Sequence, residues 1–236
     1  MIPIPINDHI RRRIFWAATL SLVVANMLVF AFELSQGRQL NRLILVLAII
    51  PARYIGPHGI TVTDPGGLFV PIFASMFLHA GWLHLLGNML FLFVFGRSIE
   101  DRYGHGQFLL IYFASGLVAA LTHILFNAGS RVPTIGASGG IAGVLGAYFV
   151  CFPGARISTL IPIFFFFWRV EIPAVFVLGY WFLIQFVAAS YQQLDIQSAT
   201  RGGTAWWAHV GGFIAGAALA LLLPPRRPRV EMIPPY

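Results

Sequence analysis

The stretch 136–143 reads Gly136-Ala137-Ser138-Gly139-Gly140-Ile141-Ala142-Gly143. Gly136 and Gly140 lie one helical turn apart, and so do Gly139 and Gly143. Small residues at this spacing let two helix backbones approach closely within a membrane. We therefore expect a helix that begins near Ser138 and packs tightly against another helix with a face of small residues.

A second stretch of small residues lies in the last apolar run of the chain. It reads Ala208-His209-Val210-Gly211-Gly212-Phe213, and Gly216 follows one turn after Gly212. Two helices lined with glycine can pack face to face and bring their ends together. Such packing would place the Ser138 hydroxyl near the His209 ring.

The composition is that of a membrane protein with several spans. Of the 236 residues, 58% are hydrophobic and only 10% are charged, whereas soluble domains carry about 25% charged residues. The net charge of +7 arises from arginines that flank apolar runs. This distribution fits orientation in a membrane and argues against a nucleic-acid partner. The single cysteine, Cys151, excludes an internal disulfide bond.

Six apolar runs are candidates for membrane spans, at 14–32, 76–95, 107–126, 137–152, 173–190 and 207–223. About 20 apolar residues cross the hydrocarbon core as a helix, because backbone groups in lipid must bond within their own segment. The first run is too long for a signal peptide, so we expect a retained first span. The sequence therefore predicts an all-α membrane protein with six transmembrane helices.

Two connecting segments are long. Residues 33–75 contain an apolar stretch at 40–50 that is too short to span, followed by repeated prolines and glycines, so we expect an outer loop with an interfacial helix. Residues 191–206 include Asp195, Gly202 and Gly203. This second segment is either a moving gate or a static loop.

The distribution of arginines predicts the orientation in the membrane. Six spans place both termini on one side, which carries ten arginines against five on the other side. Because basic residues are enriched on the cytoplasmic side, we expect both termini to be cytoplasmic. The predicted domains are a cytoplasmic segment 1–13, a six-span domain 14–223 and a cytoplasmic tail 224–236. The starts of spans two, four and six then face outward.

Polar side chains gather at this outer end. His79 and His84 lie at the start of span two, Ser138 at the start of span four and His209 at the start of span six. Taken singly, each of these residues is more simply explained as a histidine at the membrane interface or as a serine that packs between helices. Ionisable groups within a membrane are costly and face a protein interior or a wet cavity. Four such residues at one depth therefore predict a shared site.

A serine beside a histidine predicts nucleophilic catalysis. A serine hydroxyl is a poor nucleophile until a histidine within hydrogen-bond reach takes its proton. Glu33, Asp64 or Asp195 could orient the histidine, but no motif selects one of them. We therefore expect a Ser138–His209 dyad, with a triad as the alternative.

Acyl transfer also needs hydrogen-bond donors for the oxyanion that develops. His84 and Asn88 are four residues apart and share one face of a helix. The backbone N–H of Ser138, near a helix N-terminus, is a third donor. His79 lies about 140° round the helix from His84, so we expect it to line the water path or the mouth of the site.

These motifs, taken in order, resemble those of the rhomboid family of intramembrane serine proteases. The resemblance runs from about residue 40 to residue 223 and rests on four segments. They are the His-x4-His-x3-Asn pattern from His79 to Asn88, the charged turn Gly96 to Gly104 with Glu100 and Arg102, Gly136-Ala137-Ser138-Gly139, and Ala208-His209-Val210-Gly211-Gly212-Phe213.

The resemblance implies a six-helix bundle around a water-filled cavity that opens outward. It implies Ser138 as nucleophile, His209 as general base, His84, Asn88 and the Ser138 amide as the oxyanion site, and His79, Gly136, Ala137 and Gly139 as supporting residues. The implied substrates are single-span membrane proteins in the lipid bilayer, cut near the outer surface at small residues. Neither a metal ion nor an organic cofactor is implied. We expect an integral, multi-pass protein of the bacterial inner membrane.

The sequence departs from the family at two places. Val70-Pro71 stands where many members carry Trp-Arg, so the loop can be anchored differently in the membrane. Ala142 stands where some members place an aromatic residue against the base. We expect other groups, such as Trp206 or Trp207, to hold the histidine ring instead.

Three alternative functions remain to be weighed against the sequence. One is a catalytically silent rhomboid-like protein that binds transmembrane helices, although such proteins usually lack the serine or the histidine. Another is a metalloprotease or metal transporter that uses His79, His84 and His209, but the five-residue spacing of the first two is poor for one metal ion. A channel or transporter would show internal repeats and broken helices, which the sequence does not display. The oligomeric state stays open.

Overall fold

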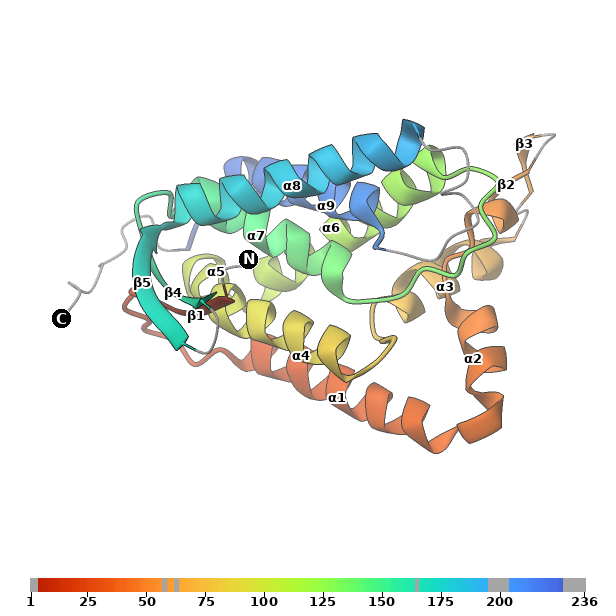
Figure 1. Cartoon of the computed structure of the whole chain (residues 1–236), viewed down its shortest axis with the longest axis horizontal. Coiled ribbons are helices and arrows are strands. Elements are labelled where there is room, and N and C mark those ends of the chain that lie inside the picture. The colour runs from red at the N-terminus through yellow and green to blue at the C-terminus, as the bar shows by residue number, and fades with distance from the viewer. Residues whose placement is uncertain (1–3, 57–58, 62–63, 164–165, 195–203, 227–236) are drawn as a thin grey trace.

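The computed structural model describes residues 4–56, 59–61, 64–163, 166–194 and 204–226, and helices dominate this part of the chain (Figure 1). Asp195, Gly202 and Gly203 lie outside the described residues, and with them most of the 191–206 segment that is either gate or loop. The predicted tail is described only over 224–226.

Each of the six apolar runs forms a helix. The helices are α1 (Ala17–Ser35), α4 (Trp82–Phe91) continuing through a π-helical turn (Leu92–Gly96) into α5 (Arg97–Tyr103), α6 (His105–Phe126), α7 (Ser138–Cys151), α8 (Ala174–Leu194) and α9 (Trp206–Leu222). Four stretches within the described residues are long and apolar enough to cross a membrane: Ala17–Ser35, Trp82–Tyr103, His105–Phe126 and Ala174–Gln192. Because α7 has 14 residues and α9 has 17, six complete spans stay a prediction.

The segment between α1 and α4 holds two further helices. The predicted helix near 40–50 is present as α2 (Leu40–Leu47). A second helix, α3 (Pro65–Ser75), contradicts the expectation of a broken loop there. Asp64 caps α3 by accepting a hydrogen bond from the Gly67 N–H at 2.6 Å, and Pro65 occupies the first position, where a missing N–H leaves no bond unmade. The residues that suggested a break therefore start a helix.

Short elements complete this connecting segment. They are 3-10 turns at Gly37–Gln39 and Pro51–Arg53 and a two-residue hairpin of β2 (Ile55–Gly56) with β3 (Gly59–Ile60). Together with α2 and α3 they lie at one end of the helical bundle (Figure 1).

An antiparallel sheet at the other end departs from the all-α prediction (Figure 1). Its strands are β1 (Ile4–Asp8), β4 (Arg156–Ile163) and β5 (Phe166–Pro173), in the order β1-β4-β5. The sequences of β4 and β5 are rich in β-branched and aromatic residues, which fit a pleated sheet better than a helix. The fold is therefore mostly helical, with a small sheet added to the bundle.

Buried carboxylates hold the sheet end of the bundle together. Asp8 pairs with Arg12 and accepts hydrogen bonds from Ser98 at 2.5 Å and from Tyr148 at 3.1 Å. Glu100 accepts hydrogen bonds at 2.7 and 2.8 Å from two backbone amides in the first turn of α1. These amides have no partner within their own helix, so Glu100 acts as a cap supplied by another segment.

The centre of the bundle is the contact between α7 and α9. A Cβ added at Gly216 would lie 1.8 Å from the carbonyl oxygen of Gly143, and one at Gly146 would lie 1.9 Å from that of Phe213. The two backbones therefore touch, which confirms the close packing expected from the small residues. α6 packs against both helices and completes the core.

We expect Gly216→Ala to weaken the bundle, because the new methyl group would overlap the Gly143 carbonyl. Overpacking of this kind costs about 1–3 kcal/mol, and each kcal/mol lowers Tm by about 2–4 °C in a chain of this size. Gly87→Ala is the matched control, since a Cβ there has no neighbour within 4 Å and alanine favours a helix. Thermal unfolding in detergent should show a lower Tm for Gly216→Ala only. Equal Tm values for the two variants would contradict the packing argument.

Candidate active site

The α7–α9 contact brings a serine and a histidine together. Ser138 is the first residue of α7, and His209 lies in the first turn of α9. Ser138 Oγ and His209 Nε2 are 2.8 Å apart, which is a hydrogen-bonding distance. His209 is buried, whereas Ser138 is only partly covered. The pair therefore has the separation that proton transfer requires.

A glutamine that is not predicted from the sequence motifs extends this hydrogen bond into a chain of three residues. Gln185, on α8, places its Oε1 2.6 Å from His209 Nδ1. An amide oxygen only accepts hydrogen bonds, so Nδ1 donates and Nε2 accepts the proton of the Ser138 hydroxyl. The available signal in the sequence is a lone amide side chain within the apolar run 173–190.

The carboxylates considered as orienting groups for His209 lie elsewhere or are not described. Glu33, near the end of α1, accepts the backbone N–H of His79, with its two oxygens at 3.1 and 3.3 Å from the nitrogen. Asp64 caps α3. Asp195 lies outside the residues that the structure describes. Both described carboxylates thus stabilise segments near the site and do not contact the histidine.

Aromatic side chains surround the His209 ring. Trp181 lies at a ring-centroid distance of 5.7 Å, and Trp206 lies edge-on at 6.4 Å. Trp207 instead stacks on Phe126 at 3.9 Å, away from the histidine. Of the two tryptophans expected to hold the ring, Trp206 therefore contacts it, and Trp181 on α8 is an additional neighbour.

A cavity of about 600 Å³ lies beside this pair, and its lining includes Ser138, His209, His84 and Asn88. The structure therefore brings four of the predicted site residues to one cavity. The Nδ2 of Asn88 is buried and has no hydrogen-bond partner among the described residues. Because an unpartnered buried donor costs free energy, this amide is ready to bind an acceptor that enters the cavity.

His84 lines the cavity, and one hydrogen bond determines which of its ring nitrogens carries the proton. Its Nδ1 accepts a long hydrogen bond of 3.4 Å from the Ala80 N–H, so its Nε2 carries the ring proton. A Cβ added at Gly136 would lie 2.8 Å from that Nε2. Gly136 has a φ of +128°, which favours glycine, and the missing side chain leaves room for the His84 ring.

The other predicted residues lie around the larger cavity and do not line it. His79 packs its ring on that of His84, with the ring centroids 5.1 Å apart. Ala137 is fully buried. Gly139 borders a second, smaller cavity, and a Cβ there would lie 2.8 Å from the Cβ of Ala119. These residues shape the surroundings of Ser138 and His84.

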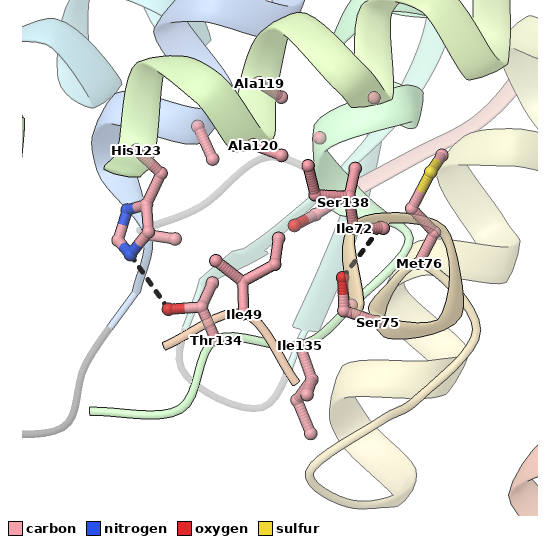
Figure 2. Close-up of a pocket in the computed structure, with 15 residues that line it drawn as sticks. Ile49, Ile72, Ser75, Met76, Ala119, Ala120, His123, Thr134, Ile135 and Ser138 are labelled. Carbon is pink, nitrogen blue, oxygen red and sulfur yellow. Dashed lines mark hydrogen bonds between the residues drawn. The ribbon is translucent and has the colours of Figure 1, made fainter. Parts of the chain in front are cut away.

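The second cavity has a volume of about 30 Å³ and also borders Ser138 (Figure 2). Two hydrogen bonds in its wall pair polar side chains. Thr134 Oγ1 and His123 Nε2 are 2.9 Å apart, and the Ser75 hydroxyl donates to the Ile72 carbonyl at 2.9 Å. Most of the remaining lining is apolar. The space therefore suits a group about the size of a methyl or a water molecule.

The three histidines weighed as metal ligands do not converge on one point. His209 bonds to Ser138 and Gln185, and His79 packs on the side of His84. Across the described ranges, no three His, Cys, Asp or Glu side chains are grouped so that they could hold a metal ion. The arrangement instead offers a hydroxyl, a base and free donors around one cavity.

Comparisons with known proteins find relatives that carry rhomboid names. RHOMBOID-like protein 1 of Arabidopsis thaliana is 31% identical over 147 residues, which cover 54% of this chain and 37% of that protein. Rhomboid protease GluP of Bacillus subtilis is 46% identical over 70 residues, which cover 30% of this chain and 13% of that protein. Putative rhomboid protease YdcA of the same bacterium is 35% identical over 77 residues, which cover 33% of this chain and 38% of that protein.

In each of these comparisons the chain spans well under two thirds of the relative's own length. The family model of the Rhomboid domain matches residues 67–226, a range that holds more than half of the chain and every residue lining the larger cavity. Since this match reaches from α3 to the end of α9 and includes several apolar helices, the chain is an integral membrane protein that belongs to the rhomboid family.

Proposed function

We propose that this chain is an intramembrane serine endopeptidase that cuts transmembrane segments of other membrane proteins. Ser138 is the nucleophile and His209 is the general base. The observation that carries the proposal is the 2.8 Å separation of Ser138 Oγ and His209 Nε2 at the wall of a cavity of about 600 Å³. A serine that only packed helices would not require a buried imidazole at this distance, because burying such a group is costly.

The geometry supports a two-step acyl transfer. His209 Nε2 takes the proton of the Ser138 hydroxyl while Oγ attacks the carbonyl carbon of the substrate. The protonated ring then gives this proton to the leaving amine, and an acyl-enzyme forms on Ser138. A water molecule in the cavity is deprotonated by the same nitrogen and attacks the ester, which releases the second product and restores the serine.

Three donors support stabilisation of the oxyanion. Asn88 Nδ2 is buried without a partner, His84 Nε2 carries a proton, and the Ser138 backbone N–H lies at the N-terminus of α7. An N-terminal amide of a helix has no partner within the helix and lies at the positive end of its dipole. Donors that are set before the reaction stabilise the negative charge that develops in the transition state.

The surroundings support a membrane substrate cut close to the outer surface. Ser138, His209 and His84 lie near the starts of α7, α9 and α4, the ends that the arginine distribution assigns to the outer side. The cavity of about 30 Å³ beside Ser138 has room for a small side chain only. We therefore propose single-span membrane proteins, cut at small residues, as substrates.

The proposed arrangement of the chain follows the same orientation. It comprises cytoplasmic segments 1–13 and 224–236 and a six-span domain 14–223 with the outer loop 33–75, whose helix α2 lies at the membrane interface. The membrane that we propose is the bacterial inner (plasma) membrane. The mechanism uses side chains of the protein alone and calls for no cofactor.

We expect Ser138→Ala to abolish cleavage of a single-span membrane protein reconstituted with the enzyme, because the attacking oxygen is removed. Ser21→Ala is the matched control: Ser21 lies on the exposed side of α1, and its hydroxyl bonds only to the Ala17 carbonyl at 2.8 Å. A fluorophosphonate probe should label the wild-type chain and Ser21→Ala but not Ser138→Ala. Wild-type cleavage by Ser138→Ala would refute the assignment. Failure of the probe and of cleavage in the folded wild-type chain would favour a catalytically silent protein that binds transmembrane helices.

We expect Asn88→Ala to lower kcat by about 100- to 1,000-fold, the usual effect of removing one oxyanion donor. KM should change little, because the amide acts mainly in the transition state. Asn41→Ala, on the exposed surface of α2, serves as the control and should keep both constants. Steady-state cleavage kinetics in detergent would give the two constants. A raised KM with an unchanged kcat for Asn88→Ala would assign this residue to substrate binding instead.

A further inference from the structure

We propose that Gln185 is a positioning residue that holds the His209 imidazole, through its Nδ1–H, in the tautomer that can accept the Ser138 proton. This inference rests on the proposed function and adds a third member to the Ser138–His209 pair. Gln185 Oε1 lies 2.6 Å from His209 Nδ1, while His209 Nε2 lies 2.8 Å from Ser138 Oγ. The three side chains form one continuous line of hydrogen bonds.

The direction of these hydrogen bonds follows from the chemistry of the groups. A neutral imidazole carries one proton, on either Nδ1 or Nε2. The Gln185 amide oxygen can only accept, so it selects the tautomer with the proton on Nδ1. Without this acceptor, the ring can adopt either tautomer. The tautomer with the proton on Nε2 cannot act as a base toward Ser138.

An amide suits this position better than a carboxylate does in a chain buried in a membrane. Gln185 and His209 are 6% and 8% exposed, so an ionised partner would have to lose most of its hydration. A neutral amide orients the ring without this cost. It also leaves the imidazolium that forms during the reaction without a fixed counter-charge, so the proton passes readily to the leaving amine.

The position of Gln185 in the sequence argues that the amide is more than a packing residue. Its neighbours Ile184 and Phe186 are apolar, and the rest of the 173–190 run has no other amide side chain. In such a helix, a leucine would be buried without any need for a partner, whereas an amide must find one. The partner that Gln185 finds is the ring nitrogen that does not face the serine.

Through Gln185, the orientation of the His209 ring also depends on a third helix, α8. Near its start α8 is tied to the α7–β4 connection by two backbone hydrogen bonds, from Ala174 N–H to the Ala155 carbonyl at 2.8 Å and from Val175 N–H to the Pro153 carbonyl at 3.1 Å. Further along, α8 is the least buried of the four candidate spans. The Gln185 bond therefore sets the histidine correctly only while this part of α8 is docked on α9.

The first test replaces the acceptor by a side chain of similar size. Gln185→Leu should lower kcat by roughly 10- to 100-fold with little change in KM, the scale expected for loss of a group that orients a catalytic residue. Gln192→Leu makes the same chemical change seven residues further along α8 and should keep wild-type kinetics. Thermal unfolding of both variants shows whether the fold persists. A folded Gln185→Leu enzyme with wild-type kcat would overturn the inference.

The second test keeps the acceptor and adds charge. Gln185→Glu should retain much more activity than Gln185→Leu, because a carboxylate oxygen still accepts the Nδ1 proton. The acid limb of its pH–rate profile should move to higher pH, because a carboxylate stabilises the protonated ring. A profile identical to that of the wild-type chain would overturn the inference, even where Gln185→Leu does not fold.

The third test reads the tautomer directly and separates the two proposals. Nitrogen NMR of protein with labelled histidine should show the His209 proton on Nδ1 in the wild-type chain and in Ser138→Ala, and a mixture in Gln185→Leu. Cleavage by Ser138→Ala would refute the proposed function itself. An inactive Ser138→Ala, together with the wild-type tautomer in Gln185→Leu, would leave the proposed function standing and refute only the role of Gln185.

Discussion

The direct contact between the α7 and α9 backbones is the constraint on which the rest of the structure depends. At Gly143 and Gly216 no side chain separates the helices, so main-chain atoms set their distance. Helices in lipid gain little from excluding water, and their association relies on such close packing. Ser138 and His209 lie at the same end of these two helices, so the separation of hydroxyl and imidazole is a consequence of backbone contact. A small displacement of either helix would lengthen a bond that tolerates only a few tenths of an ångström.

The signals that predict this arrangement are local and repeated along the chain. Long apolar runs indicate the helices, and glycines at helical spacing indicate which faces meet, so the pairing of α7 with α9 could be expected from the sequence. The helix α3 escapes prediction because Pro65 and the glycines after it are typical of loops, although Asp64 in front of them caps a helix. The strand β1 escapes it because it pairs with a strand far along the chain, and no local pattern reveals that partner. The strands β4 and β5 do carry a local signal, in their β-branched and aromatic residues. Gln185 escapes it because its contact with His209 depends on how α8 is rotated and docked.

Charged and neutral polar groups have separate places in this molecule. The carboxylates of Asp8 and Glu100 satisfy backbone and side-chain donors at the sheet end of the bundle, and Glu33 does so for the amide of His79. The line from Gln185 through His209 to Ser138 contains no carboxylate. Because desolvating a charge costs far more than desolvating an amide, this division lets the interior remain polar and ordered without a permanent charge at the reacting atoms.

The sheet imposes an order on biosynthesis. Ile4 in β1 lies opposite Leu160 in β4, so β1 has no partner until β4, which follows α7 in the chain, has been made. While the intervening helices insert, the backbone groups of β1 have only water as a partner. An unpaired strand edge of this kind can pair wrongly with other chains. Closure of the sheet is thus a late event in assembly, and it occurs only in a chain that already contains the helix that begins at Ser138.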